Sequence, residues 1–256
     1  MSADVGIVVT AAGSGSRLGY GVPKALVPLD PSGDIGGESS LFALALRHAQ
    51  LVDGVRAIIV TAPSDELELF RSTIARLGIV VPVSVVSGGP TRQASIFQGL
   101  KALKQSGPLD VVLIHDAARA LTPSVMMDRV VNAVAQGAPA VIPAIPVADT
   151  LKQIDPGIPP SPSGARRIVG NVDRGVMRIV QTPQGFAWDV AWDMHSTFAE
   201  RGMDEAQAAS DDSTMAQWAG HEVVAVEGDS LAVKVTTATD LALARVLFAQ
   251  NFGTRS

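Results

Sequence analysis

Short apolar runs alternate with segments of helical spacing along most of the 256-residue sequence. Runs rich in β-branched residues are typical of buried strands, and they occupy residues 5–9, 25–29, 55–60, 79–86, 111–114 and 140–145. Apolar residues three and four apart predict one helix that begins at residue 39 or 40, and three further helices over 64–77, 91–104 and 123–136. Strands joined through helices pair in parallel and are covered on both sides. The alternation therefore predicts an α/β, Rossmann-like fold, a mostly parallel sheet with helices on both faces.

The alternation is interrupted once, between residues 146 and 174, by a stretch rich in proline and glycine. A disordered linker is one interpretation. The other is a protruding β-hairpin arm, because residues 150–154 and 167–172 both have strand-like composition on either side of a tip at 156–164. We favour the arm, since the sheet pattern resumes after it. Strands are then expected at 177–181, 222–226 and 231–235, and helices at 186–201 and 213–218, with a closing helix capped by Thr239 or Asp240. We expect residues 1–256 to form one domain that carries this arm.

Composition excludes several classes of protein. The chain has 20 Lys and Arg against 25 Asp and Glu, a formal net charge of −5, so we expect no generic affinity for nucleic acid or for an anionic membrane. It contains no cysteine, which excludes disulfides, thiolate zinc sites and cysteine nucleophiles. No apolar stretch has the length of a membrane helix, and no signal peptide is recognisable, so we expect a cytoplasmic protein.

Three strand-like runs lead directly into small residues followed by a cation: AAGSGSR from Ala11, GGPTR from Gly88 and HDAAR from His115. Small residues leave backbone N–H groups free to surround an anion. The first loop is followed by Lys24, a second long cation after Arg17. Because the carboxyl ends of parallel strands share one edge of a sheet, these loops predict a phosphate-binding site there.

Other glycine motifs and catalytic signatures fit poorly. The first loop lacks the Gly-Lys-Ser/Thr of a P-loop, and its third dinucleotide-fingerprint position is Leu18 instead of glycine. The four histidines are scattered, so a zinc site is not expected. Asp116 directly follows a buried run, where a carboxylate could hold a phosphate-bound Mg²⁺ ion. A turn or helix N-cap aspartate explains the same residue equally well.

These motifs together give the chain a resemblance to a known family. In order, AAGSGSRLGYGVPK, GGPTRQAS, HDAARA, PVADTLK, NVDR, QTPQGF, SDDST and KVTTATDL resemble the 2-C-methyl-D-erythritol 4-phosphate cytidylyltransferases (IspD family) of the non-mevalonate isoprenoid pathway. The first motif marks the wider nucleotidyltransferase superfamily, whereas the ordered set is specific to this family and to its polyol-phosphate relatives.

The resemblance implies transfer of CMP from CTP to 2-C-methyl-D-erythritol 4-phosphate, with release of pyrophosphate and a Mg²⁺ or other divalent cofactor. A cytidylyltransferase for ribitol 5-phosphate or another polyol phosphate is the nearest alternative. A catalytically silent nucleotide-binding protein is a third possibility, although it would not need all of the cations below. Four residues are implied to be catalytic: Arg17, Lys24, Arg174 and Lys234.

The resemblance also implies the binding residues. The nucleotide would contact Ala11, Ala12, Gly13, Ser14, Gly15, Ser16, Gly89, Arg92, Ser95, Asp116 and Ala117, and Asp116 would also hold the metal. Methylerythritol phosphate would contact Arg119, Thr150, Thr182, Ser210 and Asp211. The arm would join two subunits into a homodimer and carry Arg174 to the partner's site.

Simple electrostatics supports these implications. CTP carries about four negative charges and the sugar phosphate about two, so joining them requires cations and positioning rather than a covalent intermediate. Clustered basic residues in an acidic chain are then accounted for. The chain departs from the family at Ala120, where proline is usual, at residues 231–233, and in a longer insertion at 155–165. We expect none of these to change the reaction.

Overall fold

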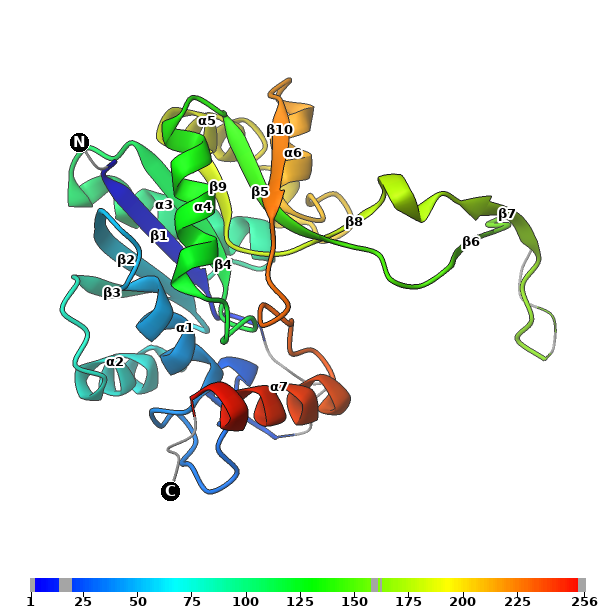
Figure 1. Ribbon diagram of the computed structural model, residues 1–256. Helices are drawn as coiled ribbons and strands as arrows, with labels where there is room; N and C mark the ends of the chain where they lie inside the picture. The colour runs from blue at the N-terminus through cyan, green and yellow to red at the C-terminus, as the bar shows by residue number, and fades with distance from the viewer. Residues whose placement is uncertain (1–2, 14–19, 158–160, 162, 253–256) are drawn as a thin grey trace.

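The computed structural model of the protein describes residues 3–13, 20–157, 161 and 163–252. Its centre is a mixed sheet (Figure 1). The strands are β1 (Val5–Thr10), β2 (Val55–Ala62), β3 (Val83–Ser87), β4 (Val111–Asp116), β5 (Ala140–Pro146), β8 (Arg178–Val180), β9 (Gln184–Ala187) and β10 (Val223–Glu227). They follow the order β10-β5-β9-β4-β1-β2-β3, with β8 beside β5.

Most neighbouring strands are parallel, as the alternation predicts. β1 is parallel to both β2 and β4, β2 to β3, and β10 to β5. The exceptions are β9, which is antiparallel to both β4 and β5, and β8, which is antiparallel to β5. The order of the parallel strands reverses between β1 and β4, because β2 and β3 lie on one side of β1 and β4 on the other. Open α/β sheets bind their ligands at such a reversal.

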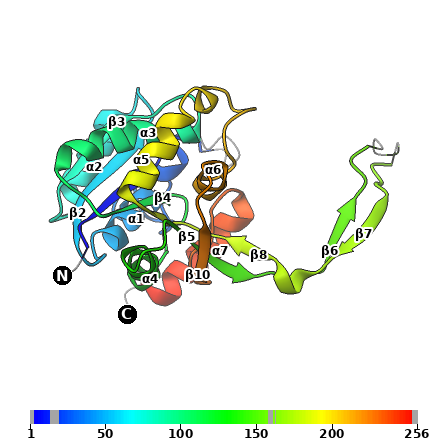
Figure 2. The ribbon, with the colours of Figure 1, turned by 90° about the horizontal axis from the view of Figure 1, so that it is seen from above.

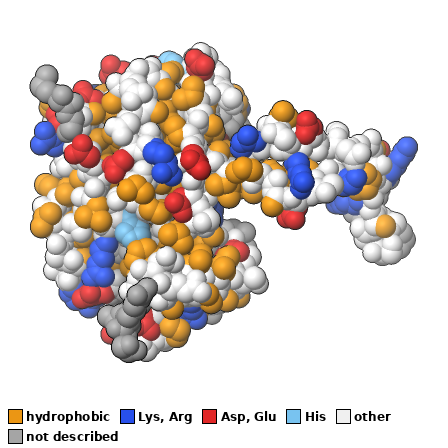
Figure 3. Space-filling view, in the orientation of Figure 1, with side chains coloured by type: hydrophobic (Ala, Val, Ile, Leu, Met, Phe, Trp, Pro, Cys, Tyr) orange, Lys and Arg blue, Asp and Glu red, His pale blue; other side chains and the backbone are white. Residues whose placement is uncertain are grey.

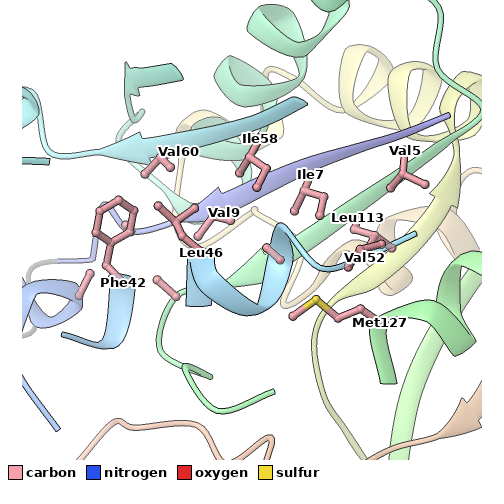
Figure 4. Packing of buried hydrophobic residues seen from close by; sticks show 14 of the residues in the cluster. Val5, Ile7, Val9, Phe42, Leu46, Val52, Ile58, Val60, Leu113 and Met127 are labelled. Atoms are coloured by element: carbon pink, nitrogen blue, oxygen red, sulfur yellow. The ribbon is translucent and has the colours of Figure 1, made fainter. Parts of the chain in front are cut away.

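Helices cover both faces of the sheet, which confirms the predicted fold class (Figure 2). They are α1 (Leu41–Ala49), α2 (Leu67–Arg76), α3 (Arg92–Leu103), α4 (Ser124–Ala135), α5 (Trp188–Thr197), α6 (Asp212–Trp218) and α7 (Ala238–Asn251). Successive side chains of a strand point to opposite faces. Val5, Ile7 and Val9 of β1 accordingly pack with α1 and α4 (Figure 4) and share a cluster with α2. Val8 packs on the other face, with α3, α5 and α6.

Close contact between the layers depends on particular glycines. A Cβ at Gly99 of α3 would lie 2.5 Å from Cγ1 of Val8, so a side chain there would push the helix off β1. A Cβ at Gly185 of β9 would lie 2.4 Å from Cγ1 of Val130 of α4. Absence of a side chain at these two positions sets the spacing between sheet and helices.

The stretch at 146–174 contains the predicted hairpin. β6 (Leu151–Ile154) and β7 (Ile168–Val172) pair antiparallel in a separate two-stranded sheet. This arm projects from the body of the molecule (Figure 1). Residues 158–160 and 162 of the expected tip lie outside the described residues.

Two predicted strands that contain proline differ from the structure: one is absent, and the other is shorter than expected. Residues 25–29 do not form a strand: Lys24–Leu26 is a single 3₁₀ turn, and Pro28 makes only an isolated bridge with Ser40. The strand expected at 79–86 begins only at Val83. Proline has no N–H to donate to a ladder, and Pro28 and Pro82 interrupt both runs.

Two further predictions in the second half are also wrong. The helix expected at 186–201 covers only Trp188–Thr197, because β9 fills the space between β4 and β5. The strand expected at 231–235 is a loop, which follows a turn in which the carboxylate of Asp229 accepts from the N–H of Leu231. The closing helix is capped by Thr237, and Asp240 completes the capping box from the third helical position.

No helix within the described ranges has the length and apolar composition to cross a membrane.

Candidate active site

The loops after β1, β3 and β4 meet at one edge of the sheet, as the sequence predicts. Thr10, the last residue of β1, is paired with both Thr61 of β2 and Asp116 of β4. A cavity of about 520 Å³ opens beside these strand ends. Its described lining residues are Thr10, Ala11, Ala12, Gly13, Lys24, Ala25, Gly89, Pro90, Thr91, Arg92, Ser95, Asp116, Ala117, Ala118, Glu205 and Lys234.

The cavity collects every predicted nucleotide-binding residue that the structure describes. These are Ala11, Ala12, Gly13, Gly89, Arg92, Ser95, Asp116 and Ala117. Two of the predicted catalytic residues, Lys24 and Lys234, line it as well. Ser14, Gly15, Ser16 and Arg17 lie outside the described residues. Residues as far apart in the sequence as Lys24 and Lys234 therefore meet around one space.

Asp116 lies at the centre of the charged groups. Its Oδ2 is 2.7 Å from Nζ of Lys234, and its Oδ1 is 3.1 Å from Nε of Arg92. The hydroxyl of Thr10 donates to the same Oδ1 at 3.2 Å. On the other side, the backbone N–H of Asp116 donates to Oγ1 of Thr182 at 3.1 Å. Both carboxylate oxygens are thus held in one orientation.

These contacts keep Asp116 ionised. Burial alone raises the pKa of its carboxyl, but the charges of Arg92 and Lys234 outweigh burial and hold the pKa well below its usual range. Burial alone lowers the pKa of Arg92, whereas Asp212 and Asp116 together raise it. The site therefore combines a fixed anion with fixed cations at neutral pH.

Arg92 also contacts a carboxylate that the sequence did not single out. Its Nη1 is 2.7 Å from Oδ2 of Asp212, the first residue of α6, and the Asp212 side chain is almost fully buried. The other oxygen, Oδ1, is 3.2 Å from Nε2 of the fully buried His195. The SDDST motif contains Asp212, but no sequence signal distinguishes its role from that of its neighbour Asp211.

The loop before α3 is packed tightly against the first loop. A Cβ at Gly88 would lie 2.8 Å from Cβ of Ala12, and one at Gly89 would lie 2.6 Å from Cβ of Ala94. The hydroxyl of Ser95 accepts from the N–H of Gly89 at 3.0 Å. Only glycine fits at these positions, so the backbone itself forms that wall of the cavity.

Lys234 is positioned by a loop that two side chains hold. Gln181 donates to the carbonyl of Asp229 at 2.8 Å and accepts from its N–H at 3.0 Å. Arg119 donates to the carbonyl of Ala232 at 2.6 Å and to that of Val180 at 3.0 Å. Arg119, predicted to bind substrate, is therefore bonded to backbone carbonyls and does not line the cavity.

The other predicted substrate residues also lie outside the cavity lining. Thr182 bonds to the backbone of Asp116 and to the ring of His115. Asp211 caps α6 by accepting from Thr214, and Ser210 contacts the Thr214 hydroxyl. Two residues at the base of the arm are exposed: Thr150, and Arg174, which donates to the carbonyl of Ala148.

The carboxylates near the cavity decide whether the site could hold the Mg²⁺ ion that the family resemblance implies. No three acidic or histidine side chains gather at ligand distance in the described part of the chain. Mg²⁺ is commonly held by one or two carboxylates together with substrate phosphates. Asp116 is ionised and lies in the cavity, so it fits a Mg²⁺ ion whose remaining ligands come from a nucleotide.

Comparison with known proteins identifies the same family as the motifs. The family model "IspD: 2-C-methyl-D-erythritol 4-phosphate cytidylyltransferase" matches residues 5–250. The enzyme of that name from Saccharopolyspora erythraea is 42% identical over 243 residues, which span 94% of this chain and 98% of the relative.

Two solved structures agree. The crystal structure of 2-C-methyl-D-erythritol 4-phosphate cytidylyltransferase from Thermus thermophilus superposes with a TM-score of 0.69 at 30% identity, covering 96% of this chain and 98% of that one. The 4-diphosphocytidyl-2C-methyl-D-erythritol synthase from Anaerococcus prevotii shares the fold, with a TM-score of 0.77 at 23% identity over 96% of each chain. With sequence and fold in agreement over nearly the whole length, the chain belongs to the 2-C-methyl-D-erythritol 4-phosphate cytidylyltransferase family.

Proposed function

We propose that this protein transfers CMP from CTP to 2-C-methyl-D-erythritol 4-phosphate, releasing pyrophosphate and forming 4-diphosphocytidyl-2-C-methyl-D-erythritol. The observation that carries the proposal is the cavity at the sheet edge, where Arg92 and Lys234 contact Asp116 and Lys24 lines the same space. Three cations in one cavity of an acidic chain suit a reaction between two phosphate-bearing substrates.

CTP occupies this cavity in the proposed complex. Its base lies against the wall formed by Gly89 and Ser95. Its triphosphate lies along residues 11–13 and continues over Ser14, Gly15, Ser16 and Arg17. Lys24 neutralises the phosphates. Cavity volumes of about 300–1,000 Å³ are typical of small-molecule sites, and this one falls within that range.

The acceptor phosphate attacks the α-phosphorus of CTP directly. A bond forms between a phosphate oxygen of methylerythritol phosphate and the α-phosphorus, while the bond to the bridging oxygen of pyrophosphate breaks. Lys234 leaves its 2.7 Å contact with Asp116 to bind phosphate oxygens. Asp116 would hold a Mg²⁺ ion, which would neutralise charge on the triphosphate when bound. Catalysis then consists of positioning and electrostatic stabilisation.

The methylerythritol phosphate site is completed by a second subunit in this proposal. Arg174 lies on the arm and does not line its own cavity. The arm also exposes apolar side chains, among them Ile154, Ile168 and Val169, and its surface carries basic side chains as well (Figure 3). A lone two-stranded sheet is marginally stable in water, so a partner that covers it is expected. The homodimer acts in the cytoplasm, without nucleic acid or membrane.

Pyrophosphate release tests the function. Purified protein with CTP and Mg²⁺ should release pyrophosphate when methylerythritol phosphate is added, and much more slowly with ribitol 5-phosphate. The Lys24→Met variant should be inactive while its thermal unfolding matches wild type, and Lys101→Met, a cation that contacts the Phe97 ring outside the cavity, serves as the control. Faster release with ribitol 5-phosphate would instead assign the polyol-phosphate activity.

A further inference from the structure

A row of buried charged and polar groups runs from the cavity into the interior. Arg92 lines the cavity, and its guanidinium contacts Asp116 on one side and Asp212 on the other. Asp212 in turn contacts His195 at 3.2 Å. Neither Asp212 nor His195 lines the cavity, and both side chains are at most 1% exposed. The proposed reaction does not use either group.

Three helix ends bring these residues together. Arg92 is the first residue of α3, Asp212 is the first residue of α6, and His195 lies in the last turn of α5. Thr91, the N-cap of α3, also donates to the carbonyl of Gly202.

The same three helix ends are tied together by another buried side chain. The amide of Gln93 donates to Phe198 at 2.8 Å and accepts from Ala209 at 3.0 Å. The backbone positions of the row are therefore fixed independently of the ion pair itself.

The hydrogen bonds define the state of His195. Its Nε2 faces an ionised carboxylate, so that nitrogen donates. Its Nδ1 is buried and has no partner among the described residues. A proton on Nδ1 would be a buried donor without an acceptor, which is costly. The neutral Nε2–H tautomer satisfies the contact to Asp212, and the ring stacks on Phe97 with 6.3 Å between the centroids.

We propose that Asp212 and His195 are positioning residues that orient Arg92 for nucleotide binding. The inference rests on the proposed function, because it takes CTP as the occupant of the cavity. Asp212 binds Nη1 of the guanidinium on the interior side. Arg92 therefore contacts Asp116 through Nε alone. Without that anchor, both edges of the guanidinium can turn to Asp116 in a bidentate pair, away from the nucleotide. His195 fixes the carboxylate of Asp212 in the required orientation.

Calorimetric titration of the full-length protein with CTP, alongside steady-state kinetics with both substrates, tests the proposal. Asp212→Asn should raise the Kd and KM for CTP about ten- to a hundredfold, the effect of losing a charged hydrogen bond. KM for methylerythritol phosphate and kcat at saturating CTP should stay within about twofold of wild type. Asp193→Asn, an exposed change on α5, is the matched control.

A conservative replacement separates positioning from packing. His195→Gln places an amide N–H near the position of Nε2, so it should keep CTP affinity near wild type. His195→Met has similar bulk without a donor, so it should weaken CTP binding about three- to tenfold. In an Arg92→Met background, Asp212→Asn should have no further effect, because Asp212 acts through Arg92.

Three outcomes overturn the proposal. One is unchanged CTP affinity in folded Asp212→Asn protein, another is equal effects of His195→Gln and His195→Met, and the third is additive effects in the Arg92→Met background. All of them can occur while wild type still releases pyrophosphate from CTP and methylerythritol phosphate. Failure of that wild-type reaction would count against the proposed function instead, and the calorimetric affinities would still report on the row of residues.

Discussion

Asp116 shows how one buried carboxylate can organise a cationic site. Its oxygens contact Thr10, Arg92 and Lys234, and its backbone N–H contacts Thr182, so residues from four other segments bond to this one residue. An ion pair of this kind gains stability only if its geometry is good and its remaining bonds are satisfied. Here the contacts do more than stabilise, because they hold cations where phosphates are proposed to bind.

Replacing Lys234 with methionine tests the proposed role of its charge. Lys234→Met keeps most of the side-chain length and removes the cation, so kcat should fall by about 10²- to 10³-fold, as for other losses of a transition-state contact. The thermal unfolding temperature should fall only modestly, because Lys234 is 42% exposed and Arg92 still pairs with the buried Asp116. Lys104→Met, whose ammonium lies over the Trp192 ring outside the cavity lining, is the control. A rate within about threefold of wild type would remove Lys234 from the mechanism.

His115 should make the protein less stable in mild acid. Burial, with Arg119 and His48 nearby, lowers the pKa of this ring to about 4, against the ordinary value of 6.5. Between about pH 6.5 and pH 4 the unfolded chain therefore binds a proton that the folded protein does not. Stability falls as the pH falls through that window, by about 1.4 kcal/mol per pH unit at most.

Urea unfolding of wild type and His115→Asn at several pH values measures this effect. As the pH is lowered from about 7 to about 4.5, the free energy of unfolding of wild type should fall more than that of His115→Asn. Above about pH 7 the difference between the two unfolding free energies should not depend on pH. Parallel stability curves over the whole range would mean that His115 takes up its proton in the folded state.

At the scale of elements, the arm is the feature with the clearest unmet requirement. It is a two-stranded sheet apart from the main one, and both of its faces carry exposed apolar side chains, since Ile168 and Val169 are adjacent on β7. Ile168→Asp combined with Val169→Asp should dissociate the proposed homodimer, because each carboxylate would be buried at the interface without a partner.

Sedimentation at micromolar concentration measures that dissociation. Wild type should sediment as a dimer, and the double variant as a folded monomer with little activity, because Arg174 would no longer reach a partner. Val80→Asp is the control, since Val80 is 87% exposed on the body of the molecule. A wild-type monomer with full activity would contradict both the dimer and the shared site.

Elements with strong local signals could be predicted from the sequence, whereas those set by distant contacts could not. Buried β-branched runs predicted β1, β2, β4 and β5 to within two residues at each end, and strand-like composition predicted both strands of the arm. β9 was missed because its short segment is a strand only between β4 and β5. The run at 231–235 has strand composition, but the contacts of Gln181 and Asp229 make it a loop.

The same division holds for the candidate site. Loop residues and Lys24, Asp116 and Lys234 follow from motifs at strand ends and from the family resemblance, and the structure brings them into one cavity. Asp212 and His195 could not be found in this way, because their relation to Arg92 exists only after three helix ends have packed.

At the scale of the whole molecule, the sheet, cavity and arm together suit one reaction, the direct joining of two phosphates. The sheet edge gathers cations from loops that are far apart in the sequence. No covalent intermediate is needed, so the molecule has only to position two anions and neutralise their charge.

Phosphorus NMR of the complete reaction tests this central claim most directly. Protein, CTP, methylerythritol 4-phosphate and Mg²⁺ should yield pyrophosphate together with one new diphosphodiester whose two phosphorus atoms are coupled, in equal amounts. The signals of the acceptor phosphate and of CTP should decrease at the same rate as the signals of the two products increase. Formation of CMP with pyrophosphate while the acceptor phosphate remains unchanged, or no consumption of CTP at all, would contradict direct cytidylyl transfer.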